Sequence, residues 1–158
     1  MDATIALDRT DLRLLALLQT QGRSSNAELA TQIRLSPSAC LRRTQRLEEA
    51  GIIAGYGARL DAKALGLGLR AFVRVQLEKH GQGDIEHFAE RIGQWDEVVA
   101  CYALTGDMDY LLHILVRDLE HFSRFLLDRL LNATGVSDVN SSFVLRVVKQ
   151  DRGVPLVG

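Results

Sequence analysis

The chain has 158 residues, of which 47% are hydrophobic and 25% charged, and this balance suits one ordinary domain or two small ones with packed cores. No apolar run approaches the roughly 18 residues of a membrane span, and the first residues lack a basic region leading into a long apolar stretch, so we expect a cytosolic protein. Cys40 and Cys101 form no CxxC pair, which argues against a disulfide framework or a metal site and favours two small buried hydrophobic residues.

The net charge of -1 conceals an uneven distribution along the chain. Residues 1–60 carry eight Arg against six Asp and Glu, a net charge of +2, whereas residues 61–158 carry eleven Lys and Arg against fourteen acids, a net charge of -3. From Arg34 to Arg59 there are five Arg and only two acids. A local basic patch on an otherwise acidic protein is typical of a nucleic-acid-binding surface.

The first part of the chain predicts two short helices. Asp8 is a candidate N-cap for the first of them, and Gly22 lies just past its expected end. Ser25 and Glu28 have the spacing of a capping box, which opens the second helix, and this helix ends near Arg34. The residues expected on the buried faces are Leu14, Leu17 and Leu18 in the first helix and Leu29, Ala30 and Ile33 in the second.

A third helix is predicted after a turn of only three residues. Ser36 can cap it, Pro37 suits its first position, and Gly51 suits its end. Its spacing separates an inward row, Cys40, Thr44 and Leu47, from an outward row, Ser38, Ala39, Arg42, Arg43, Gln45 and Arg46. Two short helices joined by such a turn, the second of them basic and pointing outward, indicate a helix-turn-helix.

The outward row has the residue types that recognise DNA. Arg pairs with guanine and Gln with adenine in the major groove, while Ser hydroxyls and helix N-terminal amides hold phosphates. An isolated run of this kind is more often a solvated helix face, but the preceding helix and turn favour DNA binding. We expect selectivity to reside mainly on Ser38, Arg42, Arg43 and Arg46. The candidate DNA-binding residues are Ser36, Ser38, Ala39, Arg42, Arg43, Gln45 and Arg46.

The remaining sequence predicts a second domain with alternating strands and helices. Residues 52–60 are typical of a short strand or hairpin, so the first domain spans residues 1–60 and a hinge spans residues 61–68. Residues 69–158 then form the second domain. Within it, residues 71–77 alternate as in a half-buried strand, and residues 98–105 and 110–116 form a hairpin of buried strands.

Two helices and a last strand complete this second domain. Asp84 and Asp118 are the candidate N-caps. The inward residues are expected to be Ile85, Phe88, Ala89 and Ile92 in the first helix, Leu119, Phe122, Leu126 and Leu130 in the second, and Val139, Phe143, Leu145 and Val147 in the strand. The order β-α-β-β-α-β is the ferredoxin-like arrangement, and the whole chain is therefore of the α+β class.

The segment G-D-M-D between the two hairpin strands is a candidate ligand loop. Gly106 permits a close backbone approach, the neighbouring amides can receive a carboxylate, and Asp107 or Asp109 can hold an ammonium group. Such a loop suits a zwitterion. The alternative is that Gly106 and Asp107 only turn a hairpin, for which both residues are ordinary choices.

Three segments together resemble a known family over nearly the whole chain. L-D-R-T-D, L-S-P-S-A-C-L-R-R-T-Q-R-L-E-E-A-G-I-I and G-D-M-D-Y-L-L are similar to the leucine-responsive and asparagine-responsive (Lrp/AsnC) regulators. The resemblance implies a winged helix-turn-helix and a ferredoxin-like regulatory domain, which dimerises through its sheet and assembles into tetramers or octamers. It also implies an amino-acid effector in a pocket between dimers, with no cofactor. The implied effector-binding residues are Leu104, Thr105, Gly106, Asp107, Asp109 and Tyr110, with Ser141 of a neighbouring subunit.

Two other classes of function have weaker support. Asp107, Asp109 and His113 lie close in sequence, as acid-base or metal-binding residues can, but there is no HExxH, G-x-S-x-G or phosphate-binding loop. The four His residues, His80, His87, His113 and His121, form no recognised ligand pattern. A ligand-sensing or interaction module without DNA function is the other alternative, since ferredoxin-like folds have many functions. The outward Arg row argues against it.

Overall fold

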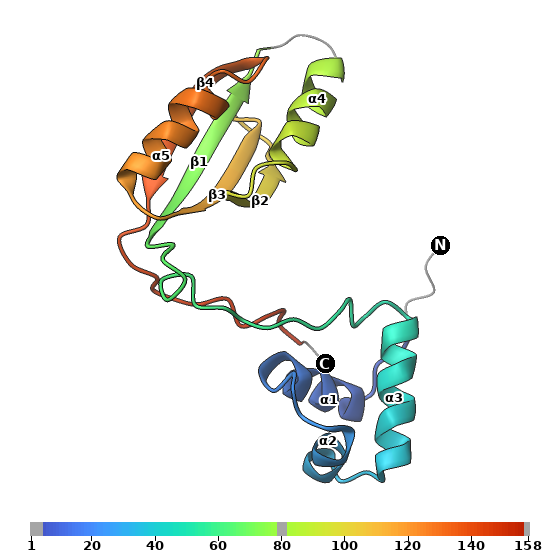
Figure 1. The fold of residues 1–158 in the computed structure, drawn as a ribbon. Helices are drawn as coiled ribbons and strands as arrows, with labels where there is room; N and C mark the ends of the chain where they lie inside the picture. Colours follow the sequence, from blue (N-terminus) through green and yellow to red (C-terminus); the bar gives the residue numbers. More distant parts are fainter. Residues whose placement is uncertain (1–4, 79–81, 157–158) are drawn as a thin grey trace. The chain divides into compact units, whose positions relative to one another are not determined.

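The computed structural model describes residues 5–78 and 82–156, and these form two compact units (Figure 1). Of these residues, one unit contains 5–59 together with 149–156, and the other contains the described residues between Leu60 and Val148. The sequence had placed all residues from 69 onward in the second domain. The contacts instead assign the residues from Lys149 to the first unit.

The first unit has the three expected helices, α1 (Arg9–Thr20), α2 (Asn26–Ile33) and α3 (Pro37–Glu49). The Asp8, Ser25 and Ser36 side chains accept hydrogen bonds from backbone N–H groups of the following first turns, as their N-cap positions predict. The core of this unit consists of Leu14, Leu15, Leu29, Ala30, Ile33, Cys40 and Leu47. Local capping signals and helical spacing therefore suffice to place these helices.

The turn between α2 and α3 places a bulky residue in an unusual conformation. Arg34 has φ +59° and ψ +46°, the left-handed region that Gly normally occupies at a helix end. Its N–H donates to the carbonyl oxygens of Ala30 and Thr31 and closes α2. The chain then reaches Ser36 and enters α3, so only residues 34–36 separate the two helices.

The strand or hairpin expected at residues 52–60 does not form, although all of these residues are described. Ile53 packs against the first core, but residues 54–60 are all exposed, so burial does not fix an extended strand. Tyr56 is held instead by its hydroxyl, which donates to Glu48 Oε1 at 2.7 Å. The pKa of Tyr56 is raised to about 12 by desolvation and by Glu48.

The residues after Lys149 pack on α1. The Gln19 side-chain amide donates to the Val154 carbonyl oxygen at 3.2 Å and accepts from the Val154 N–H at 2.7 Å. Leu156 packs against the first core, and Arg59 donates to the Asp151 carbonyl oxygen. Gly153 has φ +96°, and a Cβ at this position would collide with the Gln19 side chain. This segment therefore covers one end of the helical unit.

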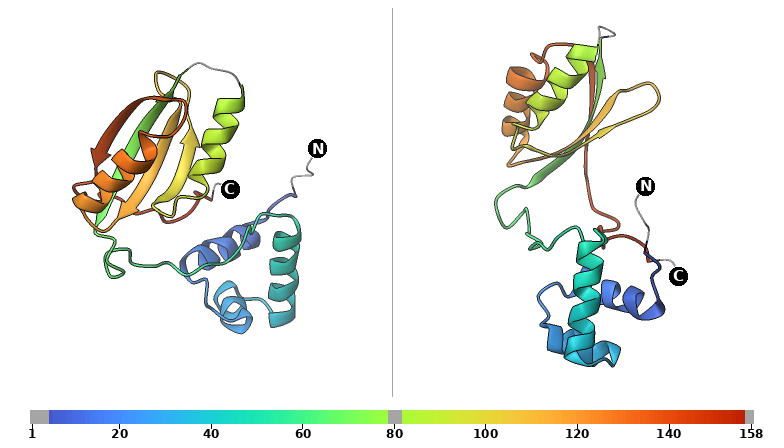
Figure 2. Two further views of the ribbon diagram at one scale, coloured as in Figure 1. Left: turned by 45° about the horizontal axis from the view of Figure 1, so that its top comes forward. Right: turned by 90° about the vertical axis from the view of Figure 1, so that its right-hand side faces the viewer.

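The second unit has the predicted β-α-β-β-α-β order. The elements are β1 (Leu69–Leu77), α4 (Gln82–Ile92), β2 (Val98–Ala103), β3 (Tyr110–Val116), α5 (Leu119–Phe125), continued by the π-helical turn η1 (Leu126–Leu130), and β4 (Val136–Phe143). The strands form one antiparallel sheet in the order β2-β3-β1-β4. Helices α4 and α5 cover one face of this sheet, as Figure 2 shows in its right-hand view.

Some residues expected to be buried lie at the surface of the chain. The exposed ones are Ala89, Leu119, Phe143, Leu145 and Val147, together with Val99, Cys101, Tyr102 and Ala103 of the strand β2 that was expected to be buried. Cys40 is buried as expected. Strand β2 lies at the sheet edge, β4 ends before Leu145, and Leu119 lies in the first turn of α5. Helix α4 begins at Gln82, so Asp84 lies inside its first turn and is not its N-cap. His80 and the side chain of Ile85 lie outside the described residues.

The face of the sheet opposite the helices is partly apolar. Alternation along β1 buries Ala71, Val73, Val75 and Leu77 on the helix side and leaves Phe72 on the other side. Phe72 is paired with His113 of β3, and their rings stack with centroids 4.8 Å apart. Phe72 keeps 36% of its surface exposed. This sheet face therefore leaves apolar surface uncovered within one chain.

Candidate functional site

Helix α3 has a buried side that fixes it to the rest of the first unit. Cys40 and Leu47 are fully buried in the core, as the inward row predicts. Thr44 is half-buried, and its hydroxyl donates to the Cys40 carbonyl oxygen at 3.1 Å. This arrangement presents the opposite side of the helix to solvent.

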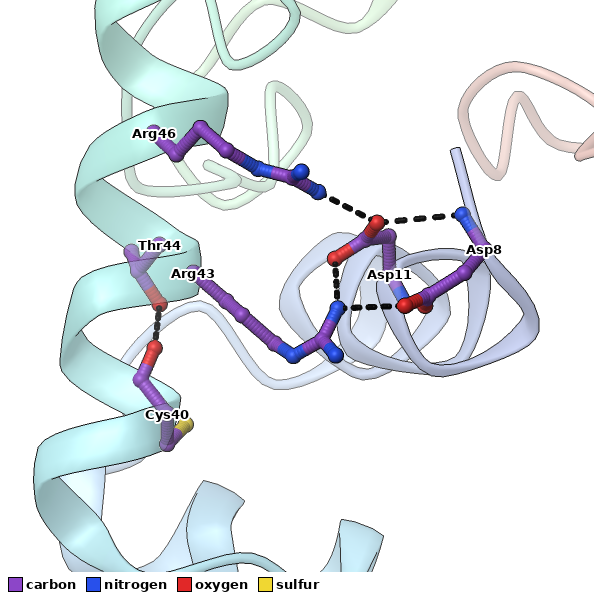
Figure 3. Close-up of polar contacts among 6 residues, drawn as sticks. All are labelled: Asp8, Asp11, Cys40, Arg43, Thr44 and Arg46. Atoms are coloured by element: carbon purple, nitrogen blue, oxygen red, sulfur yellow. Dashed lines mark hydrogen bonds and ion pairs between the residues drawn. The ribbon is translucent and has the colours of Figure 1, made fainter. Parts of the chain in front are cut away.

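A second side of α3 faces α1 through charged groups (Figure 3). Asp11 is fully buried in α1, and its Oδ1 accepts from Arg43 Nη1 at 2.7 Å. Its Oδ2 accepts from Arg46 Nη2 at 2.5 Å and from the Asp8 N–H at 3.1 Å. Arg43 Nη1 also donates to Asp8 Oδ2 at 2.7 Å. We call these four residues the Asp11 cluster.

The expectation that Arg43 and Arg46 point away from the helices is therefore wrong. Long Arg side chains reach several ångströms to a buried charge, so the direction of the Cα–Cβ bond does not fix where the guanidinium lies. The physical reason is the carboxylate of Asp11, which is costly to bury unless charged donors surround it. The sequence held a signal for this contact, because Asp11 lies on the same helix face as Leu14, Leu15 and Leu18.

The pKa directions agree with this geometry. The pKa of Asp8 is lowered, first by the hydrogen bond from the Asp11 backbone N–H and then by Arg43. The pKa of Arg43 is raised by its hydrogen bonds to Asp11 and Asp8. Each charged partner thus stabilises the ionised form of the other.

The third side of α3 carries predicted residues whose side chains are exposed to solvent. Ser38, Arg42 and Gln45 recur at i, i+4 and i+7 and are all exposed. Across the residues that the structure describes, Arg42 makes no hydrogen bond or ion pair. At the start of the helix, Ser36 is exposed and its hydroxyl lies 3.2 Å from that of Ser38, while Ala39 is half-buried. Because Arg42 and Gln45 are exposed on the same helix face, their side chains can reach into a DNA groove.

The G-D-M-D segment forms a tight turn between β2 and β3. Gly106 has φ +119°, and the Leu104 N–H donates to the Asp109 carbonyl oxygen at 2.8 Å. Asp109 is fixed by β1, because its Oδ2 accepts from the Leu77 N–H at 2.7 Å and its N–H donates to the Val75 carbonyl oxygen at 3.0 Å. Asp109 therefore has a structural role in this chain.

The other residues of the predicted effector site differ in their surroundings. Leu104, Thr105 and Asp107 are exposed. Tyr110 is half-buried, and its ring lies 5.2 Å from that of Phe88. Ser141 lies on β4, which β1 separates from β3 in the sheet, so one chain does not bring Ser141 into the turn.

The residues considered for catalysis do not form a site. His113 stacks on Phe72, and its Nε2 is buried without a hydrogen-bond partner. Its pKa is lowered by desolvation and, to a smaller extent, by Arg70. Within residues 5–78 and 82–156, no three His, Cys, Asp or Glu side chains are grouped to hold a metal ion. In the same ranges no helix has the length and apolarity to cross a membrane.

Comparison with known proteins covers both units. Residues 7–54 match the family described as winged helix-turn-helix DNA-binding, and residues 70–154 match the Lrp/AsnC ligand binding domain. The chain is 41% identical over 150 residues to the Bkd operon transcriptional regulator of Pseudomonas aeruginosa, covering 95% of this chain and 98% of the relative. It is 39% identical over 152 residues to the transcriptional regulator AzlB of Bacillus subtilis, covering 96% and 97%.

A solved structure is similar over the same extent. The transcriptional regulator of Neisseria meningitidis, solved as an L-Met complex, has a TM-score of 0.92 and 46% sequence identity. The match covers 96% of this chain and 97% of that one.

Fold, helix faces and matched domains define the chain as a transcriptional regulator that joins a DNA-binding helix-turn-helix to a ligand-binding domain of the α+β class. More specifically, the chain belongs to the Lrp/AsnC family. This is a family of regulators and not of enzymes, which removes the catalytic alternative.

Proposed function

We propose that this protein regulates genes of amino-acid metabolism by binding specific DNA sites under the control of a free amino acid. The observation that carries the proposal is the free side of α3, where Ser38, Arg42 and Gln45 are exposed next to a three-residue turn. A module that only senses a ligand has no need of such a row.

DNA recognition follows from the placement of α3. The helix enters the major groove with Arg42 opposite a guanine and Gln45 opposite an adenine. The Ser36 and Ser38 hydroxyls and the Ser38 N–H hold phosphates at the helix start, where the helix dipole attracts anions. The Ala39 N–H lies beside them and already donates to Ser36 Oγ. Arg43 and Arg46 lie on the same helix, but the Asp11 cluster occupies their guanidinium groups.

The effector site is proposed at the turn between β2 and β3. The backbone around Gly106 receives the carboxylate of the amino acid, and Asp107, which is exposed, receives its ammonium group. Asp109 and Tyr110 shape the turn through their contacts with β1 and α4. Leu104 and Thr105 line the approach, and Ser141 of a neighbouring subunit closes the site. The L-Met complex of the Neisseria meningitidis relative supports an amino-acid ligand.

Oligomer formation is part of the proposal. The uncovered sheet face around Phe72 and His113 buries its apolar surface against a second copy, and the dimers assemble further into tetramers or octamers. The dimer presents two α3 helices to successive half-sites of an operator. The protein works in the cytoplasm, where its DNA lies, and needs no cofactor.

Fluorescence anisotropy on the promoter DNA of its own gene and on scrambled DNA tests both parts of the proposal. Arg42→Ala is expected to cost about 1 to 3 kcal/mol on the promoter, or roughly 5- to 150-fold in Kd, and less on scrambled DNA. Arg124→Ala is the matched control, since Arg124 is an exposed Arg of the second unit. Equal losses on both DNAs would make Arg42 a phosphate contact.

Titration with the twenty amino acids tests the effector. One of them is expected to change promoter affinity by about 5- to 150-fold, the range of a coupling energy of about 1 to 3 kcal/mol. Asp107→Asn should abolish this response and leave the affinity without effector unchanged. If the wild type fails to prefer the promoter at low salt, the protein is a sensing or interaction module without specific DNA binding.

A further inference from the structure

We infer that Asp11 is a positioning residue for DNA recognition. It binds Arg43 and Arg46 to α1 and fixes the rotation of α3, so that Arg42 alone of these three arginines is free to contact a base. The inference rests on the proposed DNA-binding function and assigns a role to a residue that does not itself face DNA.

The burial of Asp11 makes its two arginines obligatory partners. Its side chain has 0% exposure, and both carboxylate oxygens accept hydrogen bonds from guanidinium groups. A buried carboxylate that loses such donors keeps the cost of its desolvation without compensation. If a DNA phosphate bound Arg43 or Arg46, the Asp11 carboxylate would lose one of its two charged hydrogen-bond donors. In consequence, the two arginines remain on Asp11 when the protein binds DNA.

Two anchors on one helix fix its rotation. Arg43 and Arg46 are three residues apart, nearly one turn, and both reach the same carboxylate (Figure 3). The Arg42 side chain projects outward from the helix axis, so a rotation of α3 about that axis moves its guanidinium sideways, away from a base edge. Apolar contacts through Cys40 and Leu47 hold the helix in the core but are not directional. The hydrogen bonds of the Asp11 cluster are directional, so they fix the rotation of α3 about its own axis.

Charge on the DNA-facing surface is also set by the cluster. Asp8 and Asp11 together balance the charges of Arg43 and Arg46, so these arginines release few counterions when DNA binds. Specific binding then depends on a small number of placed groups and only weakly on general attraction to phosphate.

The test is Asp11→Asn, which keeps the shape of the side chain and removes its charge. We expect the ratio of scrambled-DNA Kd to promoter Kd to fall about tenfold or more, because α3 loses its fixed rotation. Binding to scrambled DNA should hold or improve, and the slope of log K against log salt should steepen by about 1 to 2, since each freed arginine can reach a phosphate. Asp128→Asn, which removes an exposed carboxylate of the second unit, is the matched control and should change neither quantity.

A role in stability alone gives a different result. Partial unfolding of the first unit would lower binding to both DNAs and would leave the ratio unchanged, which overturns the inference. Loss of preference in the wild type would instead overturn the proposed function, so the two failures are distinguishable. An unchanged ratio and slope in folded Asp11→Asn also overturns the inference.

Arg43→Gln provides a second measurement if Asp11→Asn does not fold. Because Arg43 is predicted to act through Asp11, Arg43→Gln should lower the promoter preference without changing which base pairs are preferred. Arg42→Ala, in contrast, should relax the preference at one base pair. If Arg43→Gln changes the preference at a single base pair, Arg43 contacts that base directly and the inference is wrong.

Discussion

Removal of both guanidinium groups from the Asp11 cluster should lower the free energy of unfolding of the DNA-binding unit by an amount that the structure allows us to estimate. Met in place of Arg keeps most of the aliphatic stem and removes the charge. Arg46 is 46% exposed and makes one bond to Asp11, so its loss is expected at about 1.5 kcal/mol, the lower end for a bond to a charged group. Arg43 is 29% exposed and contacts both Asp8 and Asp11, so its loss is expected to reach about 3 kcal/mol.

The double variant Arg43→Met, Arg46→Met leaves a buried carboxylate without charged donors, which is expected to cost about 3 to 5 kcal/mol. Hydrogen exchange of peptides from α1 and α3 measures this loss as faster exchange, by about 100-fold or more if these amides exchange through opening of the whole first unit. Peptides from β1 belong to the other unit and serve as the internal control.

A third substitution, Asp11→Leu, should restore most of the protection in the double variant, because the uncompensated charge is then gone. The reasoning is refuted if the triple variant is no better protected than the double variant. It is also refuted if the double variant loses less than about 1 kcal/mol.

The remaining predictions concern single features. Arg34→Gly should raise the stability of the first unit by about 0.5 to 1 kcal/mol, measured as a higher denaturant midpoint, because the gain from relieving a left-handed residue exceeds the added entropy of Gly. The lowered pKa of His113 means that its contribution to stability is complete above the ordinary pKa of 6.5 and is lost as the pH falls through the lower folded value. Thermal unfolding at pH 7.5 and pH 5.5 should therefore show a smaller pH effect in His113→Phe than in the wild type. Gln19→Ala should speed hydrogen exchange around Val154 and leave β1 unchanged, because it removes both hydrogen bonds to that residue.

Local signals in the sequence predicted most of the secondary structure. The caps Asp8, Ser25 and Ser36 and the alternation along β1 depend on neighbours within a few residues, and all of them are confirmed. The order of elements in the second unit followed from these local assignments, since the β-α-β-β-α-β order has a well-known antiparallel arrangement.

Features that depend on distant partners were predicted less well. The guanidinium groups of Arg43 and Arg46 bind a carboxylate more than thirty residues away, which helical spacing alone does not reveal. Likewise, a strand pattern does not say which strand lies at an edge, so the exposure of Cys101 on β2 was missed. Residues 52–60 had apolar residues in a strand-like order but no neighbouring strand to pair with. The DNA-contacting and effector-contacting residues remain predictions.

The packing of the residues after Lys149 on α1 has a consequence for biosynthesis. The ribosome synthesises the whole second unit between the two parts of the first. The hydrogen bonds of Gln19 to Val154 and the packing of Leu156 on the first core can therefore form only after the second unit has been made. At about 5 to 20 residues per second, the roughly ninety residues between Arg59 and Lys149 delay completion of the helical unit by about 5 to 20 seconds. The first unit, which carries the helix-turn-helix, therefore cannot complete its packing on α1 until the ligand-binding domain has been synthesised.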